Sequence, residues 1–230
     1  MDFSEWEKYY KQILLDFGYD RSKDEEAAEV LAGLSEGHEL AGPEELRKQL
    51  SDREVCVFGD GPSLGEALES KQFHGTLVAA DGATSALMAK GIVPDIIVTD
   101  LDGKVEDQVA ANERGAIVVV LAHGDNIPAL REWVPKFRGK LVVTSQSAPV
   151  KHLHNFGGFT DGDRAVYLAD HFGARRITLV GFDFASDRGP PYTDPDELDM
   201  SDRAKVKRRK LTWANVLIAM LDNPAIEFFK

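Results

Sequence analysis

Short runs of apolar, mostly β-branched residues recur along the chain after residue 50. The runs are nearly continuous rather than alternating with polar residues, which is typical of strands buried on both faces of a sheet. Helix-like segments separate most of them, and this alternation predicts an α/β fold with a doubly wound, mostly parallel sheet. The expected strands are residues 55–58, 76–80, 96–99, 117–121, 141–144 and 177–180. The expected helices are residues 64–70, 83–90, 105–114, 127–137, 163–172 and about 202–221, followed by a short apolar tail.

The first 50 residues have a different texture, because their apolar residues fall at helical spacing. One predicted helix ends at Gly18, a second ends before Gly37, and Pro43 can open a third. We therefore divide the chain into an N-terminal helical segment, residues 1–50, and an α/β domain, residues 51–230. The segment either covers the sheet or forms a contact between subunits of a homo-oligomer.

Composition narrows the class of protein. Of the 230 residues, 43% are hydrophobic and 29% are charged, and the net charge is −12. Such an acidic domain repels a phosphate backbone, which argues against binding nucleic acid. No apolar stretch approaches the roughly 18 residues of a membrane helix, and the charged, aromatic start is no secretory signal. Cys56 lies within an apolar run and is expected to be a small buried residue, so we predict a cytoplasmic protein.

Polar clusters follow five of the six predicted strands. Ligands of open α/β sheets bind beyond the carboxyl ends of the strands, so these clusters are expected to meet at one edge. The clusters comprise residues 59–63, 81–84, 100–103, 123–126 and 181–183.

Asp100 and Asp102 are the most informative pair. If strand geometry persists, both side chains point to the same side. Two carboxylates about 4 Å apart repel by about 1 kcal/mol in water and about 4 kcal/mol in a partly buried site, and a bound cation reverses that sign. Carboxylate ligands suit Mg²⁺, which usually shares its shell with substrate phosphates. Each aspartate alone could cap a turn, but the convergence of several favours a metal site.

The loop Gly59-Asp60-Gly61-Pro62-Ser63 follows the first predicted strand and opens a helix. Glycines allow close backbone approach and a helix N-terminus attracts phosphate, so these residues are candidates for nucleotide contact. The loop matches neither the Walker motif nor the dinucleotide fingerprint. The alternative is a tight turn with Ser63 as the helix cap.

Three further groups carry candidate chemistry. Thr160 and Asp163 resemble a capping box at the start of a helix. Lys210 lies among Val206, Trp213, Leu217, Met220 and Leu221 on the expected apolar face of the last helix, where it must either reach solvent or meet an anion such as a phosphate. His123, beside Asp125, is either a ligand or base, or a residue that lines its loop. The spacing of His152 and His154 does not support a zinc site.

In this order, residues 58–64, 80–84, 94–103, 122–126, 159–164, 181–183 and 207–214 resemble the archaeal 6-hydroxymethyl-7,8-dihydropterin pyrophosphokinase family. That family is similar in fold to thiamin pyrophosphokinase. The resemblance implies an enzyme that transfers diphosphate from ATP to the hydroxymethyl group of a reduced pterin, releases AMP, and serves tetrahydromethanopterin or folate biosynthesis.

By the same resemblance, Asp81, Asp100, Asp102 and Asp125 match acidic metal and catalytic positions, although thiamin enzymes carry more than one aspartate after the strand that precedes Asp125. We expect Asp81, Asp100 and Asp102 to bind Mg²⁺, and Asp125 to orient or deprotonate the hydroxyl group.

Lys210, with Arg209, is expected to neutralise the triphosphate. Candidates for pterin contact are Thr160, Asp161, Asp163 and Asp183, because carboxylates pair well with a pterin amino edge. Two alternatives remain: a metal-dependent nucleotide-sugar transferase of the type linked to flagellin glycosylation, and a nucleotide-binding module without chemistry.

Overall fold

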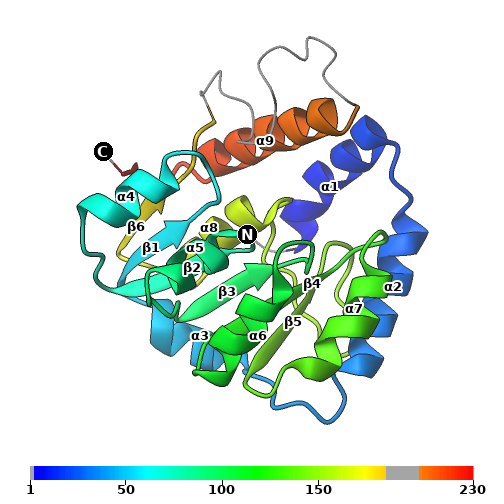
Figure 1. Cartoon of the computed structure of the whole chain (residues 1–230). Coiled ribbons are helices and arrows are strands. Elements are labelled where there is room, and N and C mark those ends of the chain that lie inside the picture. The colour runs from blue at the N-terminus through cyan, green and yellow to red at the C-terminus, as the bar shows by residue number, and fades with distance from the viewer. Residues whose placement is uncertain (1–2, 185–201, 230) are drawn as a thin grey trace.

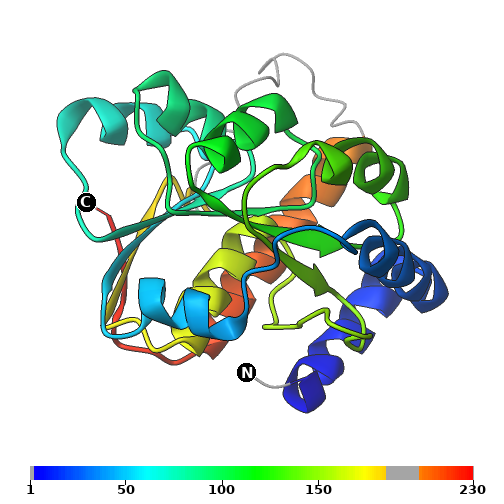
Figure 2. The same cartoon turned by 90° about the horizontal axis from the view of Figure 1, so that it is seen from below.

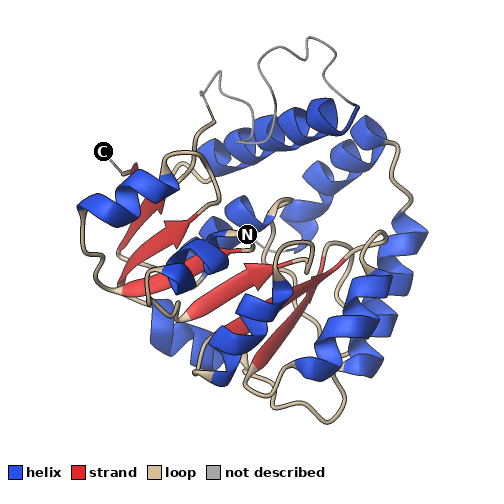
Figure 3. Ribbon diagram, viewed as in Figure 1, coloured by secondary structure: helices blue, strands red, loops and turns tan. Residues whose placement is uncertain are grey.

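One sheet forms the centre of the computed structural model, which describes residues 3–184 and 202–229. All strand pairs within these residues are parallel, in the order β5-β4-β3-β2-β1-β6-β7. Figure 3 shows the strands in red, with helices packed around them. The predicted α/β class and parallel sheet are therefore confirmed. The strands are β1 (Glu54–Phe58), β2 (Thr76–Ala80), β3 (Ile96–Thr99), β4 (Ile117–Ala122), β5 (Leu141–Ser145), β6 (Arg176–Val180) and β7 (Ile226–Phe228).

Helices cover both faces of the sheet (Figures 1 and 2). One face packs against α2, α4, α5, α6 and α7, and the other packs against α3, α8 and α9. The described helices are α1 (Phe3–Phe17), α2 (Arg21–Leu34), α3 (Pro43–Leu50), α4 (Leu64–Ser70), α5 (Ala83–Ala89), α6 (Val105–Glu113), α7 (Ile127–Trp133), α8 (Asp161–His171) and α9 (Asp202–Met220). None of them, within the part of the chain described, has the length and apolar run needed to cross a bilayer.

The sheet changes winding direction between β1 and β6. From β1 the chain moves outward through β2, β3 and β4 to β5, and then returns through α8 to place β6 on the other side of β1. Connections that leave adjacent strands toward opposite faces open a crevice at their carboxyl ends. The loop after β1 and the loop after β6 meet at this point, which is where a doubly wound sheet ordinarily binds a nucleotide.

The N-terminal segment packs on the sheet and does not form a separate layer. The apolar side chains of α2 join those of β4, β5 and α7, and those of α3 join the opposite face. Helix α1 packs Trp6, Tyr10 and Ile13 against α8 and α9. Of its two expected roles, covering the sheet is confirmed. The boundary at residue 50 stays a prediction.

One strand was missed, and two expectations about the elements were wrong. The apolar tail is a strand, β7, which pairs with β6 at the sheet edge; three residues are too few for their pattern to identify a strand. The helix predicted over 127–137 stops at Trp133 and continues as a 3₁₀ turn, Val134–Lys136, because Pro135 cannot donate an α-helical hydrogen bond.

The apolar face expected for the last helix was also wrong in part. Val206 is 41% exposed and Met220 is 46% exposed, whereas the buried residues of α9 are Ala214, Leu217 and Ile218. The buried side is therefore rotated from the expected one. Lys210 lies on this side, one turn before Ala214, and is half-buried.

Candidate metal centre and adjoining pocket

Four aspartates meet at the carboxyl edge of the sheet. Asp81 follows β2, Asp100 and Asp102 follow β3, and Asp161 is the first residue of α8. Each offers a carboxylate oxygen, and these oxygens lie within 4.8 Å of one another. Convergence of the three residues predicted as metal ligands is thus observed. Asp161, predicted to contact substrate, lies in the same cluster.

The backbone reaches this arrangement through two left-handed residues. Asp81 has φ +38° and Leu101 has φ +68°. Non-glycine residues rarely adopt positive φ, and their presence at a site indicates a conformation imposed by the surroundings. The amide of Leu101 donates to Thr99 Oγ1 at 2.9 Å, which holds the turn. The strand geometry therefore does not persist to Asp102, and a turn brings the two aspartates together.

Glycines leave room for the carboxylates. A side chain at Gly103 would collide with the carboxylate of Asp81, and one at Gly82 would collide with that of Asp60. Gly82 thus leaves room for Asp60 of the preceding loop, and Gly103 leaves room for Asp81 in the same way. The arrangement sets Asp60, Asp81 and Asp102 side by side along the ends of β1, β2 and β3.

Some carboxylate oxygens of the cluster accept hydrogen bonds, and others accept none within the part of the chain described. Asp81 Oδ1 accepts from Thr99 Oγ1 at 2.9 Å and from Gln108 Nε2 at 2.8 Å. Asp100 Oδ1 and Asp161 Oδ1 are buried and, among the residues described, have no hydrogen-bond partner. A buried carboxylate oxygen without a partner is unfavourable unless a cation or donor binds it.

Mutual repulsion and burial shift the acidities of the cluster. Burial, together with the negative charge of Asp100, raises the pKa of Asp81. Partial burial of its carboxyl and the charges of Asp100 and Asp81 raise the pKa of Asp102 to about 7. Burial and the other three aspartates raise that of Asp161. Burial also acts to raise the pKa of Asp100, but His123 and Lys210 outweigh it and lower the value.

This donor set fits a hard divalent cation. Carboxylate oxygens are the ligands that Mg²⁺ prefers, and oxygens on opposite sides of an octahedral Mg²⁺ are separated by about 4.2 Å. A small contraction of the cluster would meet that geometry and would give the two unpartnered oxygens a ligand. The side chain of Arg164 is buried behind the cluster, where it donates to Thr144 Oγ1 at 3.0 Å and to the carbonyl of Gly158 at 3.3 Å. Its charge offsets part of the negative charge of Asp161 and Asp163.

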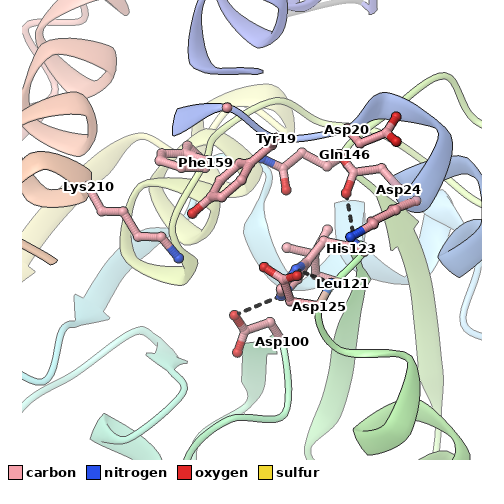
Figure 4. A pocket seen from close by; sticks show the side chains of 13 residues that line it. Tyr19, Asp20, Asp24, Asp100, Leu121, His123, Asp125, Gln146, Phe159 and Lys210 are labelled. Atoms are coloured by element: carbon pink, nitrogen blue, oxygen red, sulfur yellow. Dashed lines mark hydrogen bonds and ion pairs between the residues drawn. The ribbon is translucent and has the colours of Figure 1, made fainter. Parts of the chain in front are cut away.

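A pocket of about 120 Å³ adjoins the cluster at Asp100 (Figure 4). The connection between α1 and α2, the ends of β4 and β5, and α9 surround it. Its polar lining includes Asp125 and Lys210, both predicted as catalytic, and His123. His123 Nε2 lies 3.3 Å from Asp100 Oδ2, so this histidine joins the pocket to the cluster. Asn126 bonds the carbonyls of Asp100 and Leu121, which ties the loops after β3 and β4 together.

Comparison with known proteins identifies the family of this chain. Residues 29–189 match the family model described as 6-hydroxymethylpterin diphosphokinase MptE-like. The chain belongs to this family. It is similar to the 6-hydroxymethyl-7,8-dihydropterin pyrophosphokinase of Methanothermobacter thermautotrophicus, with 46% identity over 96% of both chains. The protein of that name from Pyrococcus furiosus is 44% identical, over 97% of this chain and 95% of the relative. That from Methanocaldococcus jannaschii is 39% identical over the full length of both.

In this family member, the loop at the β1–β6 switch point is held by its own contacts. The amides of Gly59 and Gly61 donate to the carbonyls of Val180 and Gly181. Ser63 donates through its amide and its hydroxyl group to Asp183 Oδ2, at 3.0 and 2.9 Å. Ser63 occupies the cap position of α4 without a capping side-chain bond. A phosphate at this loop would have to replace Asp183, so contact between nucleotide and residues 59–63, including Asp60 and Pro62, stays a prediction.

The remaining predicted site residues are placed by local structure. Thr160 and Asp163 form the expected capping box, and the fully buried carboxylate of Asp163 accepts from the amides of Phe159 and Thr160. Arg209 forms an ion pair with Asp16 of α1 and lies over the ring of Phe17. The structure therefore brings Asp81, Asp100, Asp102, Asp161, Asp125 and Lys210 together, and gives Asp163 and Arg209 partners within the protein.

Proposed function

We propose that this protein transfers diphosphate from ATP to the hydroxymethyl group of 6-hydroxymethyl-7,8-dihydropterin and releases AMP. The observation that carries the proposal is similarity, at 39–46% identity over nearly full length, to three proteins with that activity in their names. Those names favour the diphosphokinase over the nucleotide-sugar transferase. A fold relationship to thiamin pyrophosphokinase, a cytoplasmic location and a homo-oligomeric state remain predictions.

We further propose that Asp81, Asp100, Asp102 and Asp161 hold Mg²⁺. When bound there, Mg²⁺ would neutralise charge on the phosphates during transfer. The two buried, unpartnered carboxylate oxygens support this assignment. Loops at β2 and β3 and the start of α8 fix the ligands, so little reorganisation is needed when metal and nucleotide bind together.

The reaction requires an in-line attack. The hydroxyl oxygen of the acceptor forms a bond to the β-phosphorus of ATP while the bond from that phosphorus to the α–β bridging oxygen breaks, and AMP leaves. Asp125, exposed at the mouth of the pocket, is our candidate to orient the hydroxyl group and take its proton. Lys210 would meet phosphate charge from the opposite wall. Arg209 would contribute only by leaving Asp16.

The test is incubation of the purified protein with ATP, Mg²⁺ and 6-hydroxymethyl-7,8-dihydropterin. We expect AMP and the pterin diphosphate in equal amounts, and no product when EDTA removes the metal. Formation of ADP, or turnover of sugar nucleotides alone, would contradict the proposal. Asp100→Asn should abolish product, whereas Glu106→Gln, an exposed carboxylate on α6 outside the cluster, should retain it.

A further inference from the structure

The pocket beside Asp100 lies on one side of the aspartate cluster, and the crevice at the β1–β6 switch point, where we predict that the nucleotide binds, lies on the other. Along the sheet edge, the ends of β5 and β4 border the pocket, β3 and β2 carry three of the four aspartates, and β1 and β6 form the switch point. In-line displacement needs the attacking and leaving oxygens on opposite sides of the phosphorus. With the nucleotide at the switch point, the acceptor must approach from the pocket.

Gln146 is a buried polar residue that this pocket leaves unpaired. It follows β5 directly and is 5% exposed. Its backbone carbonyl accepts from Trp6 Nε1 at 2.9 Å and from Asn155 Nδ2 at 3.1 Å, which fixes its position. The residue lines the pocket, and among the residues described we find no hydrogen bond made by its side-chain amide. An amide that is held in place at a pocket and makes no bond within the protein is suited to pair with a ligand.

Aromatic rings form another wall of the pocket. Tyr19 and Phe159 both line it, and Phe17 packs between them, with ring centroids 5.3 Å from each. Lys210 Nζ lies 5.7 Å from the ring of Phe159, which places a cation between the rings and the metal centre. A flat heteroaromatic ring gains stacking energy on such a wall while its substituent points toward Asp100.

Asp24 gives the pocket a rigid rim. Its carboxylate accepts from the hydroxyl group of Tyr10 at 2.7 Å and from the amide of Gly124 at 2.8 Å. These bonds join α1, α2 and the loop after β4. Both oxygens of Asp24 are therefore engaged in bonds within the protein, so Asp24 is not our candidate for ligand recognition, whereas Gln146 lines the pocket at the end of β5.

We propose that this pocket binds the bicyclic ring of the acceptor, with Tyr19 beside its face and the side-chain amide of Gln146 paired with its lactam edge. A lactam offers an adjacent N–H donor and C=O acceptor, and a carboxamide offers the complementary pair. The hydroxymethyl group then points to Asp100 and Asp125. The inference rests on the proposed function and adds the specificity site, formed largely by residues from the α1–α2 connection and the end of β5.

The experiment measures the two substrates separately. Calorimetry with 6-hydroxymethylpterin, in the presence of Mg²⁺ and α,β-methylene-ATP, gives acceptor affinity, and α,β-methylene-ATP alone gives nucleotide affinity. For Gln146→Leu we expect acceptor affinity to fall tenfold or more, with nucleotide affinity within twofold of wild type and KM rising for the acceptor alone. Gln12→Leu, the same change on the exposed face of α1, is the control and should bind both ligands normally.

Tyr19 provides an independent variant because it is only half-buried and its loss should not unfold the protein. Tyr19→Phe should keep acceptor affinity, whereas Tyr19→Leu should lower it severalfold. Unchanged acceptor affinity in both Gln146→Leu and Tyr19→Leu, or loss of nucleotide affinity in its place, would overturn the proposed pocket. A wild-type protein that forms no pterin diphosphate would refute the proposed function as well, so the two failures are distinguishable.

Discussion

Removal of one charge from the aspartate cluster should stabilise the metal-free protein and inactivate the enzyme. In Asp102→Asn, the repulsion of Asp102 by Asp81 and Asp100 disappears. At 4.8 Å, each pair repels by about 1 kcal/mol in water and about 3.5 kcal/mol at the dielectric of a protein surface. Asp102 is exposed, so solvent screening favours the lower end, and we expect about 2 kcal/mol for the two pairs.

Thermal unfolding in EDTA and in 10 mM Mg²⁺ tests this reasoning. For a chain of this length, about 2 kcal/mol corresponds to a melting temperature about 4 °C higher or more in EDTA. Mg²⁺ should raise the melting temperature of the wild type, by preferential binding to the folded state, and should have little effect on Asp102→Asn. Turnover should fall about a hundredfold, or about 3 kcal/mol in barrier.

The matched control is Glu106→Gln, which removes a carboxylate without touching the cluster and should behave as wild type in both solutions. Two results would refute the reasoning. A lower melting temperature for Asp102→Asn in EDTA would mean that the carboxylates do not repel one another in the folded protein. An undiminished response to Mg²⁺ would place the metal elsewhere.

Three further predictions concern Lys210, Arg164 and His154. Lys210→Met should weaken ATP use at least tenfold in kcat/KM with an unchanged melting temperature, while exposed Arg208→Met should retain activity; equal kinetics for both would leave Lys210 a packing role only. Arg164→Met should lower the free energy of unfolding in urea by about 3 kcal/mol, because it leaves buried carboxylates uncompensated, and a loss below about 1 kcal/mol would contradict this role. Burial, with the charge of His152, lowers the pKa of His154. The unfolded chain therefore binds a proton near pH 6.5 more readily than the folded chain, and the free energy of unfolding should fall between pH 7 and pH 5. Urea titrations should show a smaller fall for His154→Gln.

The fold was readable from sequence because its strands are buried on both faces. A strand such as β4, with every residue buried, has to be apolar throughout, and the helices between strands begin and end near polar or glycine residues. The predictions that failed concern single elements. The three residues of β7 gain their strand conformation from pairing with β6, and the side of α9 that is buried depends on where α1 and α8 lie. Tertiary contacts decide such features.

The site was predictable to the extent that the strand-end rule applies. From that rule we predicted that Asp81 and Asp100, which lie in different loops, would be close in space. It did not assign Asp161 to the cluster. Asp161 is separated from β5 by a long connection, and the way α8 packs on the sheet places it beside the other aspartates. The polar residues Ser145-Gln146-Ser147, at and just after the end of β5, offered the same strand-end signal as the other loops, and we did not recognise it in the sequence.

The boundaries of the family match separate two parts of the site. Residues 29–189 contain all four aspartates of the cluster, so the candidate metal site lies within the part of the chain that matches the family model. Tyr19, Asp24 and Lys210 lie outside that range, yet they form walls of the pocket. If the acceptor binds there, the flanking helices complete a specificity site on a core built for diphosphate transfer. Changes in α1 and α2 should then alter which acceptor is used and leave metal binding intact, because the four aspartates of the cluster come from the ends of β2 and β3 and from α8, and not from α1 or α2.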